Sequence, residues 1–358
     1  MWYFLVIPTV TILVLLLFFR NRTIWWEYFV PFIASIISIA LLNKTCDYAL
    51  ASDEEYHGGW VISTVWDEHW TEKYTTTSTD KKGRTHTITH YRYHPDKYKV
   101  VDSNGYEIDT DSNDFSRLKN LFGNQKSEKP WHLGQSSWGD GYRYTSDWPG
   151  SQHTYVPCLS SHRYENRVAR SHSIFNFREV DPKKYHLYKY PEIENYYNQK
   201  SILGFNDSEA ESFLTKFNCA YGGIKKVRVF ILVFCNEPVD AGIEQQMYWK
   251  NGNKNEVVIC IGIDSSRSEI KWVYPFAWDN EYLKIDLREN ISELKLLDMK
   301  KVVDITTNLV LNKFKMKNFK EFEYLTLDPP LWIIVLCLFF NLALNFGILY
   351  WVIFNNYS

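Results

Sequence analysis

Three long apolar segments constrain this 358-residue chain more than any other feature of its sequence. They cover residues 2–19, 24–42 and 331–354, and the first contains no charged side chain. A helix that crosses a bilayer needs about 20 consecutive apolar residues. The sequence therefore predicts a multi-pass membrane protein with three transmembrane helices, two near the start of the chain and one near its end.

Aromatic and basic residues flank these segments in the manner typical of membrane proteins. The aromatic residues expected at the membrane interface are Trp25, Trp26, Trp332 and Trp351. Basic residues that precede the third segment, and that suit anionic headgroups, are Lys313, Lys315, Lys317 and Lys320. A cleaved signal peptide is the alternative for the first segment, which lacks a basic start and a small-residue cleavage site. Buried core helices are the alternative for all three.

Charged residues give opposite answers about the side of the membrane that holds the central domain. Under the positive-inside rule, Arg20 and Arg22 place the first loop in the cytoplasm and the domain outside. Lys44 and the four lysines before the third segment place the domain in the cytoplasm. The five cysteines of the central domain are odd in number and widely spaced, so they indicate no dense disulfide framework. This favours the cytoplasmic side of the membrane for the domain.

Composition narrows the class of the central domain. Lysine and arginine total 40 against 42 aspartates and glutamates, which argues against a generally cationic nucleic-acid binder. Hydrophobic residues make up 45%, so the chain is not disordered. We predict an α+β fold with a transmembrane hairpin at 1–43, a region of β-hairpins and aromatic loop at 44–200, a mixed α/β subdomain at 201–328 and a transmembrane helix at 329–358.

Residues 58–94 have the pattern of a long β-hairpin. Strand residues to Thr77 and from Thr85 flank the turn signal at 80–84. If the hairpin turns at Lys82, paired residue numbers sum to 164. This register pairs Arg92 with Glu72, His90 with Tyr74, and His94 with Trp70.

The sharpest candidate for chemistry is a ladder of histidines on this hairpin. His86, His90 and His94 share one face because side chains alternate along a strand. With Glu68 nearby, three histidines could hold zinc or iron. Residues four apart on a strand are about 13 Å apart, however, so a single metal would need a bent strand. The alternatives are a polar outer face and a pH-sensitive surface.

A long segment at 124–200 has little regular period but many aromatic residues. Loops of this length in compact domains are usually functional or disordered, and the aromatic density argues against disorder. The predicted binding residues are Trp131, Trp138, Tyr142, Tyr144, Trp148 and Tyr155. The alternative is a loop whose rings pack against the sheet.

Residues 201–327 follow the order of an α/β sheet. Ser208 and Glu211 form a capping box before the first helix. Strands are predicted at 227–235, 256–263 and 269–276, with helices at 240–249 and from about 293 to 311. The glycine pairs at 58–59 and 222–223 lack a phosphate-loop context and mark the boundaries of elements.

One stretch of this region has a family likeness. It comprises a strand at 229–234, a helix that ends at Tyr248-Trp249-Lys250, a Gly/Asn turn at 252–255 and a strand at 257–264. Residues 227–278 thereby resemble the TPM domain of membrane-tethered bacterial proteins and of a thylakoid lumen protein. The resemblance implies the phosphatase activity and calcium binding suggested for that family, with Asp264 as the one residue carried over. The chain departs from the family pattern at Glu256 and at 272–278.

Two functional hypotheses follow from these features. Because no P-loop, nucleophile elbow, H-E-x-x-H or CxxC motif is present, the first is a non-enzymatic, membrane-anchored protein. Its domain would bind a partner protein, an envelope component or itself, without nucleic acid and without a required cofactor. The alternative is a membrane-anchored, phosphatase-like hydrolase that uses a divalent metal at the histidine ladder or at Asp264.

Overall fold

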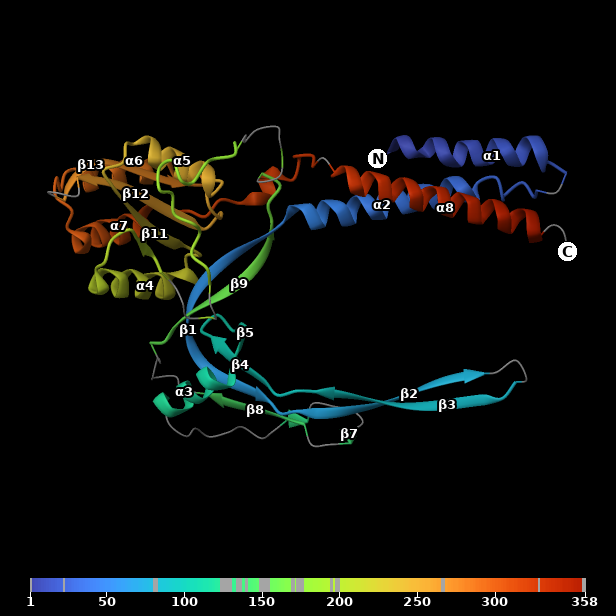
Figure 1. Cartoon of the computed structure of the whole chain (residues 1–358), viewed down its shortest axis with the longest axis horizontal. Coiled ribbons are helices and arrows are strands. Elements are labelled where there is room, and N and C mark those ends of the chain that lie inside the picture. Colours follow the sequence, from blue (N-terminus) through green and yellow to red (C-terminus); the bar gives the residue numbers. More distant parts are fainter. Residues whose placement is uncertain are drawn as a thin grey trace. The chain divides into compact units, whose positions relative to one another are not determined.

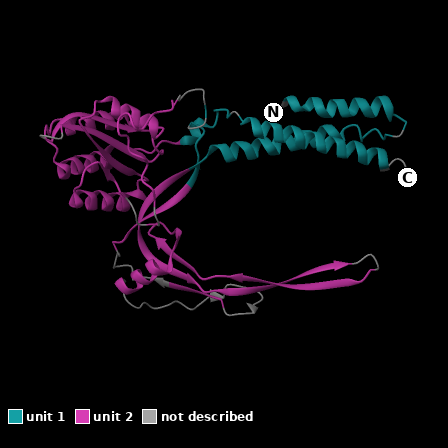
Figure 2. Cartoon of the chain, viewed as in Figure 1, with its two compact units in different colours: residues 1–53, 163–176, 319–358 teal, residues 54–162, 177–318 magenta. Residues whose placement is uncertain are grey.

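The chain has a mixed α+β fold, which confirms the predicted class (Figure 1). The computed structural model describes residues 2–21, 23–79, 83–122, 131–132, 137–138, 141–147, 155–168, 171, 177–193, 196, 200–264, 268–327 and 329–355. The chain forms two compact units (Figure 2). Unit 1 comprises Met1–Asp53, Arg163–Asn176 and Phe319–Ser358, and unit 2 comprises Glu54–His162 and Phe177–Asn318.

Apolar helices make up most of unit 1. Helices α2 (Val30–Ala51) and α8 (Leu331–Asn355) are long and apolar enough to cross a membrane. The first apolar segment forms a 3-10 turn, η1 (Trp2–Leu5), and a shorter helix, α1 (Val6–Phe18). Pro8 lacks an N–H group and therefore lies in the first turn of α1. Two of the three expected spans are thus present at full length.

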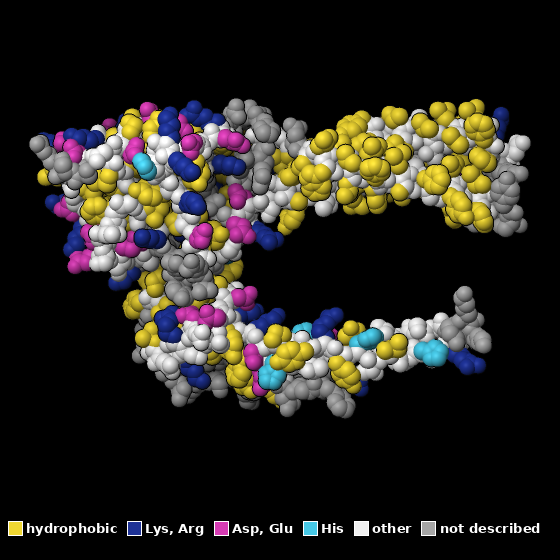
Figure 3. Space-filling view, in the orientation of Figure 1, with side chains coloured by type: hydrophobic (Ala, Val, Ile, Leu, Met, Phe, Trp, Pro, Cys, Tyr) yellow, Lys and Arg dark blue, Asp and Glu magenta, His cyan; other side chains and the backbone are white. Residues whose placement is uncertain are grey.

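Unit 1 buries several polar side chains among its apolar core residues and exposes many apolar side chains. Asn341, Asn345 and Ser35 are buried between α2 and α8, where Nδ2 of Asn345 donates to Oγ of Ser35 at 2.9 Å. This bond joins α8 to α2, and Nδ2 of Asn345 also donates to the carbonyl oxygen of Asn341 within α8. Outward-facing side chains such as Phe339 and Phe346 are apolar and exposed, and hydrophobic atoms cover these helices in Figure 3.

A six-stranded sheet forms one part of unit 2. It has the order β5-β4-β1-β8-β6, and β9 also pairs with β1. The strands are β1 (Ser52–Asp67), β4 (Lys97–Asp102), β5 (Glu107–Thr110), β6 (Trp131–His132), β8 (Tyr142–Asp147) and β9 (Pro157–Glu165). Helix α3 (Ser112–Phe122) packs on this sheet through Leu118, against a small core that includes Val61 and Val100.

A parallel sheet with helices on both faces forms another part of unit 2 (Figure 1). Strands β10 (Ile202–Leu203), β11 (Arg228–Cys235) and β12 (Glu256–Asp264) are parallel, and β13 (Glu269–Ala277) is antiparallel at the edge. Helices α4 (Ser208–Gly222), α6 (Glu281–Ser292) and α7 (Met299–Lys313) share one core with the sheet. Helix α5 (Asp240–Tyr248) and residues 180–190 pack on the opposite face. A short 3-10 turn, η2 (Phe319–Phe322), belongs to unit 1.

Three local expectations for this part were wrong. Asp207 caps α4 by accepting from the N–H groups of Glu209 and Ala210, while Glu211 instead accepts from the backbone of residues 201 and 202. Helix α6 was not expected, although its buried side chains recur every four residues at 283, 287 and 291. Cys235 lies in an apolar strand run, where a buried thiol is ordinary and was expected, but it is exposed at the end of β11.

Candidate functional site: an exposed two-stranded ribbon

The predicted hairpin forms a long ribbon of two strands, β2 (Trp70–Thr79) and β3 (Thr85–His94). Ten residue pairs run without a register shift from Trp70–His94 to Thr79–Thr85. Every pair of residue numbers sums to 164, so the predicted register is confirmed. A third strand, β7 (Ser137–Trp138), pairs with β2 at the base of the ribbon. We call residues 70–79 and 83–94 the ribbon.

Both faces of the ribbon are open to solvent beyond its base, where residues 70–73 are half-buried. Ile88 is 54% exposed on one face, and Tyr91 and Tyr93 are 62% and 63% exposed on the other. An isolated two-stranded hairpin is marginally stable in water, because stable sheets pack one face on a core. The ribbon therefore lacks the burial that normally stabilises a sheet.

Cross-strand contacts occupy the histidine face of the ribbon. The ring of His94 stacks on Trp70 with centroids 4.2 Å apart, and that of His90 stacks on Tyr74 at 5.0 Å. The guanidinium of Arg92 lies 5.4 Å from the centre of the Tyr74 ring. Such aromatic pairs stabilise a sheet locally by about 0.2–1 kcal/mol each.

The structure does not bring the three histidines of the ladder together. His86 lies opposite Ser78, while His90 and His94 lie opposite aromatic residues further along β2. No group of three His, Cys, Asp or Glu side chains among the described residues could hold a metal ion.

The predicted aromatic binding residues are distributed over short strands of unit 2. Trp131 and Trp138 belong to β6 and β7, and Trp148 lies outside the described residues. The ring of Tyr144 stacks on Trp66 of β1 at 4.9 Å, next to Tyr142. Tyr155 is 65% exposed and meets Trp60 edge-on at 5.8 Å. For Tyr144, the alternative of a ring packed on the sheet describes the structure, whereas Tyr155 is largely exposed.

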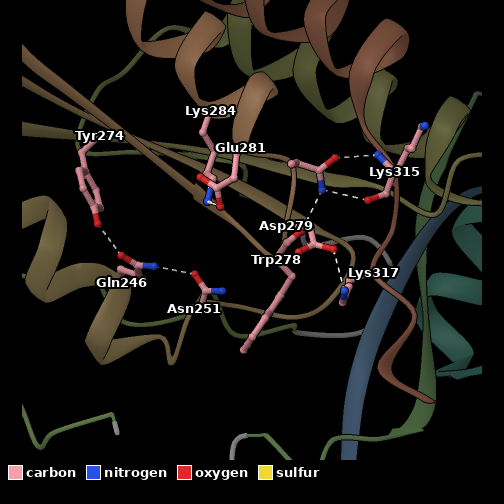
Figure 4. Close-up of polar contacts among 10 residues, drawn as sticks. Gln246, Asn251, Tyr274, Trp278, Asp279, Glu281, Lys284, Lys315 and Lys317 are labelled. Atoms are coloured by element: carbon pink, nitrogen blue, oxygen red, sulfur yellow. Dashed lines mark hydrogen bonds and ion pairs between the residues drawn. The ribbon is translucent and has the colours of Figure 1, made fainter. Parts of the chain in front are cut away.

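The basic stretch before α8 is partly engaged by acidic residues of unit 2 (Figure 4). Lys313 pairs with Asp286, and Nζ of Lys317 lies 2.9 Å from Asp279. The N–H of Lys315 donates to Asn280, and Lys320 lies in η2. The apolar residues that alternate with the lysines include buried Phe314 and Phe319, so the alternation reflects packing.

Asp264, the one residue carried over from the family resemblance, ends β12 opposite Glu269.

A shallow cavity of about 210 Å³ lies beside β13, between α5 and α6. Its polar groups bind one another, as Figure 4 shows: Tyr274 donates to Gln246 at 2.6 Å, and Gln246 donates to Asn251 at 2.8 Å. Lys284 pairs with Glu281 at 2.6 Å. Arg288 also lines the cavity, but the other polar groups satisfy one another, so the cavity offers few groups to a ligand.

Sequence reasoning missed a buried polar cluster within unit 2. Nε2 of His57 lies 3.3 Å from Oε1 of Glu55 without hydrogen-bond geometry, and Nζ of Lys254 lies 3.2 Å from the same oxygen. The rings of His57 and His162 stack at 4.2 Å. Burial alone would raise the pKa of Glu55, but the adjacent His57 and Lys254 outweigh it and lower that pKa. No local sequence signal marks this cluster, because its members come from β1, β9 and the turn before β12.

A second buried network lies at the start of β11 and β12. Arg228 is 2% exposed, donates to the hydroxyl of Tyr190 at 2.9 Å and lies 4.4 Å from the Phe230 ring centre. Tyr190 in turn donates to the buried Glu256 at 2.5 Å. Burial raises the pKa of Tyr190, and the nearby carboxylate raises it further, so the phenol stays protonated and donates. Arg228 and Glu256 are thus linked through one hydroxyl.

The two glycine pairs, which the sequence assigned to boundaries, meet in space. A Cβ added to Gly58 would lie 2.2 Å from the carbonyl oxygen of Asn218, and one added to Gly222 would lie 2.5 Å from the nitrogen of Gly58. Strand β1 thus lies against the last turn of α4 at backbone distance, which only glycine permits.

Unit 2 is expected to lose stability as the pH falls below about 6.5. Burial lowers the pKa of His162, and neighbouring His57 and Lys226 lower it further against the raising effect of Glu55 and Asp102. In the unfolded chain His162 has its ordinary pKa of about 6.5 and therefore binds a proton at a higher pH than in the folded chain. The contribution of neutral His162 to stability is thus fully present above about pH 6.5 and is lost as the pH falls toward the lower pKa of the folded state. Urea midpoints between pH 7.5 and 5.5 should fall in the natural chain and fall less in His162→Phe. Equal slopes for the two proteins would contradict this expectation.

Comparisons of the chain with protein-family models, with curated proteins and with solved structures found no match. The likeness of residues 227–278 to the TPM domain stays a prediction from the sequence. The function is therefore argued from the geometry described above.

Proposed function

We propose that this chain is a non-enzymatic, membrane-anchored protein whose ribbon binds a partner protein. The observation that carries the binding role is the ten-pair ladder of β2 and β3, which is exposed on both faces beyond its half-buried base at residues 70–73. A partner that covers one face would supply the burial that the ribbon lacks. Exposed Tyr91 and Tyr93 suit such a contact, because tyrosine gives a large contact area and a polar hydroxyl.

The arrangement of unit 1 supports the membrane anchor. In water, helices bury apolar side chains and expose polar ones, whereas here Asn341 and Asn345 are buried and Phe339 and Phe346 are exposed. A lipid environment favours this arrangement, because polar side chains then bond between helices while apolar ones face acyl chains. Trp26 and Trp351 lie 6.4 Å apart at one end of the helices, and Trp332 begins α8 at the other end. Aromatic residues at both ends fit two interfaces.

We extend the anchor to α1 as a third, shorter span. Four residues of 3-10 turn at about 2.0 Å and thirteen of α-helix at about 1.5 Å give about 28 Å, close to the hydrocarbon thickness of about 30 Å. Phe4 of η1 packs with Ile39 of α2 and Cys337 of α8, so the three helices share one core.

A photoreactive amino acid at Tyr91 tests the binding role directly. In intact membranes, irradiation should give an adduct of one defined mass, because Tyr91 lies on the exposed face of β3. The matched control is the same amino acid at Tyr282, which is 83% exposed on α6. The absence of an adduct at position 91, or the same adducts at both positions, would refute the binding role.

The chain should also stay in the membrane pellet after alkaline carbonate washing, and its release would refute the anchor.

A further inference from the structure

We infer that the outer edge of β3 takes up an acidic β-strand of the partner, which pairs with it through backbone hydrogen bonds. This inference rests on the proposed binding function and specifies its chemistry. In this binding mode an extended segment joins an open sheet edge, the backbone supplying affinity and the side chains supplying selectivity. Three observations carry it.

The first observation is the open edge of β3. The order of the small sheet is β3-β2-β7, so β7 occupies the outer side of β2 at Thr71 and Glu72. Strand β3 pairs with β2 alone among the strands that the structure describes. Its outer edge therefore presents a row of N–H and C=O groups along ten residues.

The second observation is that β3 lacks the backbone features that protect natural edge strands. Besides carrying charged side chains, such strands are usually short, bulged, interrupted by proline or covered by another element. Strand β3 is ten residues long, contains no proline and keeps one register throughout. By contrast, the ladders of β1 with β4 and of β12 with β13 each contain a register shift. A regular, unprotected edge suits the addition of a strand.

The third observation is the charge of the ribbon. The ribbon contains the basic residues Lys73, Arg84 and Arg92 and the acidic residue Glu72, although the whole chain has a formal net charge of −2. Arg92 is exposed and lies 3.8 Å from Glu72, and basic and histidine side chains are visible along the ribbon in Figure 3. An acidic strand complements it, because opposite charges on neighbouring strands stabilise a sheet and like charges destabilise it.

These observations also favour one occupant over the others. A second copy paired through β3 would set Arg92 and the histidines of two copies on neighbouring strands, and β3 has no acidic residue to balance them, which like charge disfavours. Anionic lipid or nucleic acid would satisfy the charge but would leave the backbone edge unpaired, because phosphates do not supply a matching row of amides.

Binding of two designed strands to the full chain in detergent micelles tests the inference. The probes are labelled ten-residue peptides, one alternating glutamate with valine and the other alternating lysine with valine. We expect the acidic peptide to bind about tenfold or more tightly than the basic one, by fluorescence anisotropy at low salt. In Arg92→Glu this preference should shrink. Equal affinities, or dimerisation of the chain without peptide binding, would overturn the inference.

Proline substitutions separate edge pairing from simple charge attraction. Successive N–H groups of a strand point to opposite sides, so one of Thr87→Pro and Ile88→Pro removes an outward donor and spares the β2–β3 ladder. Amide exchange of β2 identifies that variant, and it should bind the acidic peptide at least about tenfold more weakly. Unchanged binding in that variant would overturn edge pairing, while the adduct at Tyr91 would still support the proposed function.

Discussion

Replacing Arg228 by methionine is expected to destabilise unit 2 by about 3–5 kcal/mol. The guanidinium is buried, donates to Tyr190 and through it faces the buried carboxylate of Glu256. Methionine fills a similar volume but removes the positive charge, and an uncompensated buried charge costs about this much. Urea unfolding of the full chain in detergent, followed by tryptophan fluorescence, measures the change.

Two further variants make the Arg228 experiment decisive. Arg288→Met, on the exposed face of α6, should change the stability by less than about 0.5 kcal/mol. Glu256→Leu removes the carboxylate that Arg228→Met leaves unpaired. The double variant should therefore lose less stability than the sum of the losses in the two single variants. Additive losses would show that the two side chains are not energetically linked.

An alanine at Gly58 is expected to cost about 2–3 kcal/mol, while an alanine at Gly59 should cost less than about 1 kcal/mol. At Gly58 the new Cβ meets the backbone of Asn218 at 2.2 Å, which cannot move aside without displacing α4. At Gly59 its nearest neighbours are side-chain atoms of Ser103 and Asn104 at 3.0 Å, which shift more readily than the backbone of α4 although they bond to Trp60 and Gly58.

Urea unfolding of Gly58→Ala and Gly59→Ala compares the same chemical change at two adjacent positions. The difference between the two variants therefore isolates the effect of the contact with α4. The loss in Gly58→Ala should extend to amides of β11 and β12, because α4 packs on the same core as these strands. Equal stabilities of the two variants would mean that β1 does not need the close approach to α4.

The parts of the structure that were predictable from sequence are those with local signals. The register of β2 and β3 followed from one turn signal and from the alternation of side chains, and all ten pairs agree with it. The strands of the parallel sheet followed from continuous apolar runs. The apolar segments gave α2 and α8, although α2 continues past the predicted boundary at residue 43 to Ala51.

The parts that could not be predicted depend on contacts between distant residues. Gly58 and Gly222 are both ordinary in their own sequence context, and only the fold brings their backbones together. His57 and His162, and likewise Arg228 and Glu256, come from separate strands or loops, so no spacing marks them. The capping residue of α4 was misassigned by one position because Asp207 and Ser208 both suit a helix start.

The two long apolar helices flank unit 2 in the chain, and this has a consequence for cleavage in the anchored protein we propose. A soluble part held by one span is released into solution by a single proteolytic cut. Here a single cut between α2 and α8 leaves each fragment attached to its own span, so shedding requires two cuts. The double tether also restricts the unfolded chain between α2 and α8, and this favours refolding after local opening.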